Sequence, residues 1–198
     1  MSVHALALSA NHEFTKPLVP EITLLTGLGV EGDCHLGATV QHRSRLHISP
    51  PPPNLRQVHL IPKEILDQVD LQPGQIGENI ATLGIDLLSL GKGTKLHFLP
   101  APDPSTTSPT GVYKDESQEA NHPIVTIQGL RNPCPQIDKF RPGLKERFVV
   151  RDEERKIVGR RAGVMGTVER GGKVVVGMRV VVEEVGEEEG GFVELGCV

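Results

Sequence analysis

Cys134 is the side chain whose surroundings most favour chemistry, because it lies between two prolines and close to an arginine. Proline disfavours the α conformation in the residue before it, so Asn132 and Cys134 should both be extended. Pro135 suits the first position of a helix, so residues 136–140 are predicted to form a short helix with Cys134 as its N-cap. The positive end of that helix and the nearby Arg131 favour the thiolate, the form that attacks and that binds metals. The alternative is a structural cysteine in a proline-rich turn.

Three further groups of polar residues are candidates to share a pocket with Cys134. Two are the segments 31–33 (Glu-Gly-Asp) and 77–79 (Gly-Glu-Asn). The third is a set of histidines and arginines, which are His35, His42, Arg43, Arg45, His47, Arg56 and His59. Arginine and histidine donors suit a polyanionic ligand such as a phosphate. The histidine spacing matches no standard zinc pattern, and the chain has no Cys-x-x-Cys or His-x-x-x-His motif. His59 could equally be a buried histidine whose hydrogen bonds are satisfied.

A cysteine–histidine hydrolase is a second interpretation of Cys134. It needs a base within hydrogen-bond reach of the thiol, yet no histidine follows His122 and no hydrolase signature surrounds the cysteine. The other two cysteines are weaker candidates, because Cys34 follows a Gly-Asp turn and Cys197 is close to the end of the chain. The anion-pocket interpretation therefore takes precedence.

Composition bounds the class of protein. A chain of 198 residues can bury one substantial core, and with 5 Phe and no Trp that core must be aliphatic. The 22 glycines and 16 prolines indicate many turns and short strands. A net charge of −4 without a polybasic tract argues against a nucleic-acid partner. No apolar run approaches the roughly 18 residues that span a membrane, so no membrane association is expected.

The compartment follows from the N-terminal sequence and the cysteines. The first 20 residues lack a charged segment followed by an apolar one, so we expect no secretory leader. Three cysteines form an odd and sparse set, which fits a reducing compartment better than a disulfide framework. We therefore predict a cytoplasmic protein.

Strand patterns dominate the chain. They are predicted at 3–9, 22–30, 56–61, 93–98, 123–129, 162–168 and 173–184, the last two joined as a hairpin through 170–172. Short helices are predicted at 63–69, 136–140 and 143–150. Many short strands with glycine corners and few helices predict a mainly β fold, a mixed, strand-rich closed barrel with two or three short helices.

The predicted organisation is a single domain over residues 1–185. A proline-rich loop at 49–54 and an insertion at 100–122, rich in Pro, Ser and Thr, interrupt this domain. The insertion lacks an apolar pattern and is predicted to be disordered or loosely packed, and residues 186–198 form an acidic tail.

Five segments occur in an order that points to a known family. They are 29–33 (Gly-Val-Glu-Gly-Asp), 56–61 (Arg-Gln-Val-His-Leu-Ile), 77–80 (Gly-Glu-Asn-Ile), 129–134 (Gly-Leu-Arg-Asn-Pro-Cys) and 162–165 (Ala-Gly-Val-Met). Together they resemble the MOSC domain, the molybdenum cofactor sulfurase C-terminal domain, and most of all the small stand-alone MOSC proteins. The resemblance runs from about Val3 to about Val182 and so covers nearly the whole chain. The proline-rich loop and the insertion depart from the compact family pattern.

The resemblance implies a pyruvate-kinase-like β-barrel and a single key cysteine, which Cys134 matches. In the family this cysteine is thought to ligate molybdenum in a bound pterin cofactor or to carry sulfur as a persulfide. Some relatives reduce N-hydroxylated compounds, and others are fused to a pyridoxal-phosphate cysteine desulfurase that supplies sulfur. We expect the desulfurase, or a reductase, to be a separate partner, since the chain has no room for the former and no flavin, haem or iron–sulfur motif.

Site residues follow from the resemblance together with the local chemistry. Arg131 and Asn132 are predicted to act with Cys134, which would also be the molybdenum ligand. A molybdopterin carries a terminal phosphate that needs cationic or amide donors. Those predicted to bind it are His42, Arg43, Arg45, Arg56, His59 and Asn79. Two hypotheses remain, a molybdenum-dependent oxidoreductase and a sulfur carrier without turnover of its own, and the oligomeric state stays open.

Overall fold

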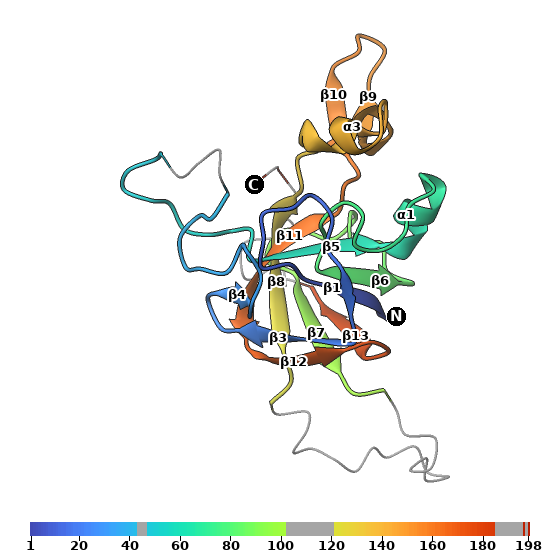
Figure 1. Cartoon of the computed structure of the whole chain (residues 1–198). Helices are drawn as coiled ribbons and strands as arrows, with labels where there is room; N and C mark the ends of the chain where they lie inside the picture. Colours follow the sequence, from blue (N-terminus) through green and yellow to red (C-terminus); the bar gives the residue numbers. More distant parts are fainter. Residues whose placement is uncertain (43–46, 102–120, 185–195, 197) are drawn as a thin grey trace, which may run out of the picture.

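The main sheet of the computed structural model, which describes residues 1–42, 47–101, 121–184, 196 and 198, closes into a seven-stranded barrel. In hydrogen-bonded order its strands are β13 (Arg179–Glu183), β7 (Lys95–Leu99), β8 (Ile124–Leu130), β11 (Val164–Arg170), β5 (Val58–Pro62), β6 (Ile80–Leu83) and β1 (Ser2–Ala7). Neighbouring strands of the described barrel are antiparallel except for β5 and β6. The predicted mainly β, mixed, closed barrel is confirmed (Figure 1).

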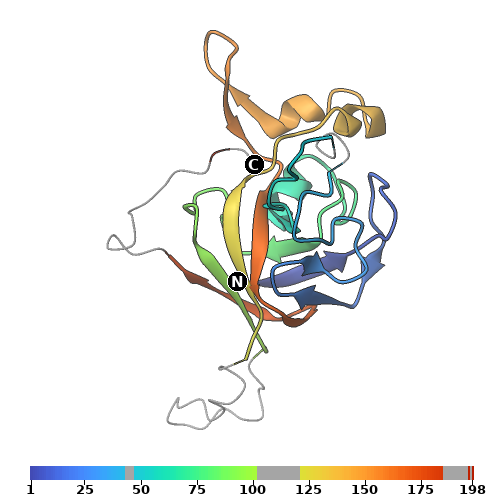
Figure 2. The same ribbon diagram turned by 90° about the vertical axis from the view of Figure 1, so that its left-hand side faces the viewer.

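Smaller elements surround the barrel. The strands are β2 (Leu18–Val19), which pairs with β1, the three-stranded sheet of β12 (Gly172–Val175), β3 (Glu21–Leu25) and β4 (Gly29–Val30), and the hairpin of β9 (Val149–Arg151) and β10 (Ile157–Arg160). The helices are α1 (Lys63–Gln68), α3 (Gln136–Phe140) and the 3₁₀ helix η2 (Lys145–Phe148). The β9–β10 hairpin projects beyond the barrel, next to α3 (Figure 2). None of the helices in the described ranges has the length and apolar content needed to cross a bilayer.

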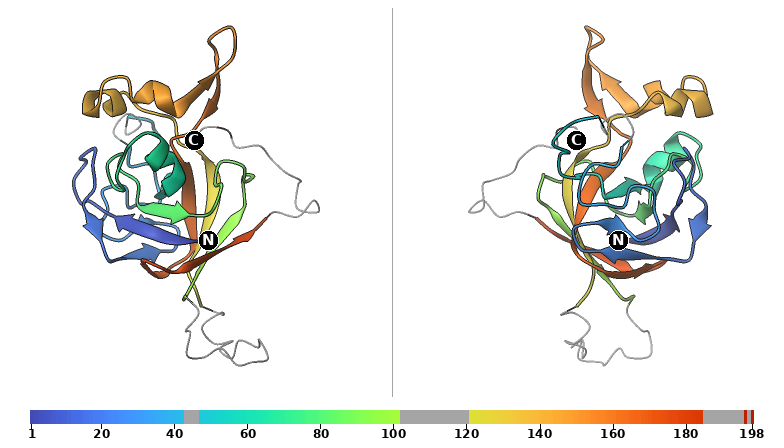
Figure 3. Two further views of the ribbon diagram at one scale, coloured as in Figure 1. Left: turned by 90° about the vertical axis from the view of Figure 1, so that its right-hand side faces the viewer. Right: turned by 60° about the vertical axis from the view of Figure 1, so that its left-hand side comes forward.

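Two apolar clusters hold the fold together. One fills the barrel and is largely aliphatic, as predicted, with Phe98 as its one aromatic member among the described residues. The other lies outside the barrel wall and joins α1, α3 and η2 through Leu66, Ile137 and Phe148. Figure 3 shows α1 between the barrel strands and α3. Burying side chains of this size contributes about 1.5–3 kcal/mol each, so the second cluster firmly anchors the segment that carries Cys134.

The helix predicted at 143–150 is only partly correct. Its apolar residues Leu144 and Phe148 are buried as expected, but the helical part is the single 3₁₀ turn η2. Val149 and Val150 belong to β9 and pair with β10. Two consecutive β-branched residues favour an extended backbone. The strand that pairs with them, β10, comes later in the sequence.

The hairpin predicted through 170–172 is wrong. β11 pairs with β5 and β8 within the barrel, whereas β12 pairs with β3 in the small sheet. The strand predicted at 173–184 is likewise divided into β12 and β13 by a turn in which Gly177 has a φ of +90°. The glycines therefore mark a transfer of the chain between sheets, which sequence periodicity does not distinguish from a hairpin.

Several predicted segments fall wholly or partly outside the described residues. Most of the 100–122 insertion and most of the 186–198 tail are among them. At the described end of the chain, the Leu130 N–H donates to the Gly196 carbonyl at 2.8 Å, and the Val198 N–H donates to the Leu130 carbonyl at 3.4 Å. The domain boundaries stay predictions.

Candidate functional site

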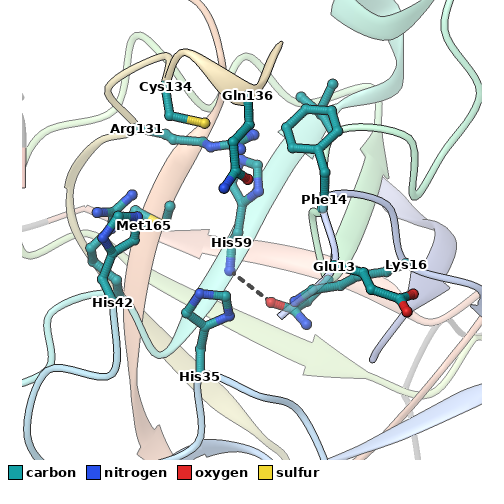
Figure 4. Close-up of a pocket in the computed structure, with 14 residues that line it drawn as sticks. Glu13, Phe14, Lys16, His35, His42, His59, Arg131, Cys134, Gln136 and Met165 are labelled. Atoms are coloured by element: carbon teal, nitrogen blue, oxygen red, sulfur yellow. Dashed lines mark hydrogen bonds between the residues drawn. The ribbon is translucent and has the colours of Figure 1, made fainter. Parts of the chain in front are cut away.

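Cys134 borders a cavity whose wall is rich in basic and histidine side chains (Figure 4). These side chains are Lys16, His35, His42, Arg56, His59 and Arg131. They come from the β1–β2 connection, the segment after β4, β5 with the residues before it, and the end of β8. Phe14 and Met165 add apolar surface, and Glu13 adds the one acidic side chain among the described lining residues. The barrel thus brings together four segments that are far apart in the sequence.

The cavity is narrow. Its volume is about 80 Å³. By the same measure one water needs about 10–15 Å³, so the cavity admits a few waters or a group the size of a phosphate. A larger ligand would therefore place only one end inside and the rest at the mouth.

The Cys134 loop is fixed on both sides. Before the cysteine, the Arg131 N–H donates to the Gly163 carbonyl at 2.9 Å. After it, the Ile137 N–H donates to the Cys134 carbonyl at 3.1 Å, and the Ile137 side chain is fully buried. Helix α3 has the predicted bounds, but Pro135 takes the N-cap position predicted for Cys134, and no side chain caps the helix. The half-buried thiol is left to face Arg131 and the cavity.

Arg131 is the buried cation next to this thiol. Only 8% of the residue is exposed, and its Nη1 atom has no hydrogen-bond partner among the described residues. Burial lowers the pKa of Arg131, while its interactions with Cys134 and with the Glu78 carboxylate oppose that shift. An unsatisfied buried donor costs about 1–3 kcal/mol, and more for a charged group. A ligand anion at the cavity would remove that penalty.

Glu78 and Asn79 support the wall behind the cavity. The Glu78 carboxylate accepts the Gly74 N–H at 2.5 Å and the Ile76 N–H at 3.3 Å. Burial raises the pKa of Glu78, and these two hydrogen bonds oppose the shift. The Asn79 amide accepts the His59 N–H at 3.2 Å and donates to the Ala7 carbonyl at 3.3 Å. The Asn79 side chain, predicted to bind the cofactor, lines the cavity but is engaged in holding β1, β5 and β6 together.

His59 lies in the cavity wall as a neutral side chain. Its Nε2 is 2.8 Å from the Ala162 carbonyl, a distance at which Nε2–H donates to that oxygen. Burial, followed by the positive charge of Arg131, lowers the pKa of His59 well below its ordinary value, and the bond to Ala162 opposes this. The ring therefore adds no positive charge to the anion pocket. Of the two interpretations of His59 in the sequence, the geometry favours the satisfied, buried histidine.

A buried ion pair underlies the same wall. Lys16 Nζ donates to Asp33 Oδ2 at 2.6 Å, and the two side chains are 3% and 1% exposed. The same oxygen accepts Asn79 Nδ2 at 3.0 Å. Burial alone would raise the pKa of Asp33, but the hydrogen bonds from His35 and the charge of Lys16 outweigh it and hold the pKa well below its ordinary value. Sequence reasoning singled out Asp33 and missed Lys16, because nothing near Lys16 distinguishes it from a surface lysine.

Of the remaining predicted site residues, some line the cavity and others do not or lie outside the described residues. His42 and Arg56 line the cavity as expected. Asn132 is exposed, accepts a hydrogen bond from Arg160 Nε at 3.2 Å and does not line the cavity. Arg43 and Arg45 lie outside the described residues. The lining residues that sequence reasoning did not select are Glu13, Phe14, Lys16, Ile76, Gln136 and Met165.

Comparison with known proteins extends the assignment of the fold. No protein-family model matches the chain, and no curated protein does. Among solved structures, the YuaD protein of Bacillus subtilis superposes with a TM-score of 0.65 at 21% identity, over 93% of this chain and 96% of YuaD. YiiM of Escherichia coli gives 0.52 at 16% identity, over 94% of this chain and 71% of YiiM. YiiM of Geobacillus stearothermophilus gives 0.56 at 13% identity, over 92% and 75% respectively. Likeness at identities this low shows the fold alone, and the chain shares that fold with YuaD and the two YiiM proteins.

Proposed function

We propose that this protein binds a molybdenum-containing pterin cofactor at the cavity, with Cys134 as the protein ligand of the metal, and reduces N-hydroxylated compounds. One observation carries the proposal. The buried Arg131 guanidinium lies beside the Cys134 sulfur and keeps an Nη1 donor without a partner among the described residues. A buried cation next to a thiol is suited to a ligand that combines a thiophilic metal with negative charge.

The donor set fits this ligand. A thiolate is a soft ligand that suits a thiophilic metal, and the bound cofactor would supply the redox chemistry that side chains lack. Arg131, His42 and Arg56 would hold anionic groups of the ligand, since all three line the cavity. Phe14 and Met165 would exclude water beside the thiol. Because the cavity is narrow, most of the pterin would lie at its mouth. Electrons would come from a separate reductase.

A sulfur carrier is the second candidate, and the size of the cavity favours it. About 80 Å³ accommodates one extra sulfur on Cys134 more easily than a large cofactor. The Cys134 thiolate would attack the outer sulfur of a persulfide on a cysteine desulfurase. The S–S bond of the donor breaks, a new S–S bond forms on Cys134, and the donor cysteine leaves as a thiolate. Arg131 would stabilise the negative charge on the terminal sulfur.

Cys134→Ser separates the two candidates. For protein purified from a host that makes molybdopterin, we expect stoichiometric molybdenum and pterin in the wild type and at least about a tenfold loss of molybdenum in the variant, because a serine hydroxyl is a harder and weaker ligand. Metal analysis and pterin fluorescence measure both quantities, and Cys34→Ser is the matched control. Metal-free wild type with a sulfane-sulfur mass increment on Cys134 would instead support the carrier. If neither signal appears, and Cys134→Ser changes only stability, both candidates fail.

Arg131→Lys tests the anion contact. Lysine keeps the charge but loses the planar fork, and its shorter reach leaves the charge further from the cavity. We expect cofactor occupancy to fall about tenfold, equivalent to roughly 1.4 kcal/mol, as expected for a lost hydrogen bond to a charged group. Arg151→Lys is the control, because Arg151 pairs with Glu146 on the surface, away from the cavity. Equal occupancy in the two variants would contradict the role of Arg131.

A further inference from the structure

A cluster of two histidines and a cysteine includes His35, which lines the cavity on the side opposite Cys134 (Figure 4). His12 belongs to the connection after β1, and Cys34 and His35 follow β4. One ligand atom from each of the three residues lies within 4.8 Å of the others. Cys34 Sγ is 3.2 Å from His35 Nδ1, and the His12 and His35 rings meet edge to face with centroids 5.5 Å apart. We propose that His12, Cys34 and His35 form a site for a divalent transition metal of the zinc class.

The donors select the metal. One thiolate and two imidazoles match the preference of Zn²⁺ and other borderline-soft ions, whereas Mg²⁺ and Ca²⁺ require oxygen ligands. Tetrahedral zinc with ordinary Zn–S and Zn–N bonds holds its ligand atoms about 3.3–3.6 Å apart. The Cys34–His35 separation of 3.2 Å is slightly shorter than this spacing. The His12 ligand atom lies at most 4.8 Å from those of Cys34 and His35. A rotation of the exposed His12 side chain can shorten these distances to the zinc spacing.

Hydrogen bonds fix the backbone of the two adjacent ligands. The Cys34 N–H donates to the Ser9 carbonyl at 2.8 Å, and the His35 N–H donates to Asp33 Oδ1 at 3.1 Å. Asn54 Nδ2 donates to the His35 carbonyl at 2.9 Å. A pre-positioned backbone reduces the entropy that metal binding must overcome. Asp33 Oδ1 is also 3.3 Å from the same His35 Nδ1, a contact that a metal bound at Nδ1 would replace.

The Cys34 thiol is unsuited to act as a nucleophile. Burial and the negative charge of Asp33 raise the pKa of Cys34 to about 11, and Lys16 only partly opposes this. The thiol is therefore protonated and unreactive at neutral pH in the absence of a metal.

Three protein ligands leave one tetrahedral position for water or another ligand. Since His35 also lines the cavity that holds Cys134, a metal at this site would border the same cavity (Figure 4). The two sites use different residues, and neither Cys134 nor Arg131 takes part in the zinc-class site. The inference therefore does not depend on the proposed function.

Cobalt titration tests the site directly. The full chain is treated with a chelator and titrated with Co²⁺, and its ultraviolet and visible spectra are recorded. We expect one equivalent to bind with a thiolate-to-cobalt charge-transfer band, which Zn²⁺ then removes by competition. Cys34→Ser should abolish the band, and His12→Asn should weaken binding by at least about tenfold.

Two matched controls make the result specific. Cys134→Ser removes the other described thiol, and His47→Asn replaces an exposed histidine outside the cluster. Both should keep the wild-type titration. Absence of Co²⁺ binding in the wild type, a band that survives Cys34→Ser, or a band lost in Cys134→Ser would each overturn the proposal.

Circular dichroism of every variant confirms folding. If Cys34→Ser is unstable, His12→Asn still tests the site, because His12 is exposed. Molybdenum content in the same samples reports on the proposed function separately.

Discussion

Replacing Asp33 with asparagine (Asp33→Asn) should lower the free energy of unfolding by about 3–5 kcal/mol, the usual cost of removing one member of a buried ion pair. Asp33 and Lys16 are almost fully enclosed, so the variant leaves the ammonium group without a counter-charge. It also weakens acceptors for the Ser9 N–H, the His35 N–H and the Asn79 amide. Urea denaturation followed by circular dichroism measures the loss.

The exposed pair of Lys63 and Asp67 on α1 is the matched control, since Asp67→Asn removes a carboxylate that is 56% exposed. That change should cost about 0.5 kcal/mol. Adding Lys16→Met to Asp33→Asn should restore part of the lost stability, because it removes the unpaired buried charge. Equal effects of Asp33→Asn and Asp67→Asn would show that the buried pair contributes no more than a surface pair.

The pH dependence of this effect has a definite sign. Asp33 has a pKa well below its ordinary value in the folded protein, and an unfolded aspartate titrates at about 4. A carboxyl whose pKa is lowered by folding contributes stability that is complete above the unfolded pKa and is lost as the pH falls through the folded one. The difference between wild type and Asp33→Asn should therefore be constant near neutral pH and shrink below about pH 4. Growth of the difference on acidification would contradict this account.

Local signals explain which parts of the site could be predicted from the sequence. The prolines around Cys134 restrict the backbone without reference to the rest of the chain, and α3 has the bounds predicted from them. The strand pattern before Pro62 and the helix after it were likewise local, and β5 and α1 confirm them. Lys16 and His12 carry no such signal. Their roles arise only when the β1–β2 connection folds against the segment after β4.

Two of the segments that resemble the family, 31–33 and 77–79, have a different role in the structure from the one predicted. Sequence reasoning treated 31–33 and 77–79 as sources of ligand-binding groups. In the structure, Asp33, Glu78 and Asn79 are buried and satisfy one another or nearby backbone groups. Their chemistry therefore shapes the wall, while Arg131, Arg56 and His42 line the cavity. A sequence motif gives residue types and spacing, but whether a polar side chain faces a ligand or a neighbouring strand depends on contacts made across the barrel.

Gly163→Ala is expected to be the other strongly destabilising substitution. Gly163 precedes β11 with a φ of +89°, a conformation that side chains rarely adopt. A Cβ at this position would lie 2.2 Å from the Leu60 carbonyl oxygen and 3.0 Å from His59 Nε2. Backbone strain of about 1–2 kcal/mol and overpacking of about 1–3 kcal/mol together predict a loss of roughly 2–5 kcal/mol. Thermal and urea unfolding measure it.

Gly143→Ala separates the two contributions, because Gly143 has a φ of +79° but a Cβ added there would meet no described atom within 4 Å. It should cost only the backbone strain, about 1–2 kcal/mol.

Gly163→Ala has a further consequence, since the Gly163 carbonyl accepts the Arg131 N–H. Displacing that carbonyl moves the buried guanidinium away from Cys134, so cofactor occupancy should fall in the folded fraction of Gly163→Ala and not in Gly143→Ala. Equal stability losses in the two variants would show that β5 can yield to the added methyl group, and unchanged occupancy would show that Arg131 is positioned independently of Gly163.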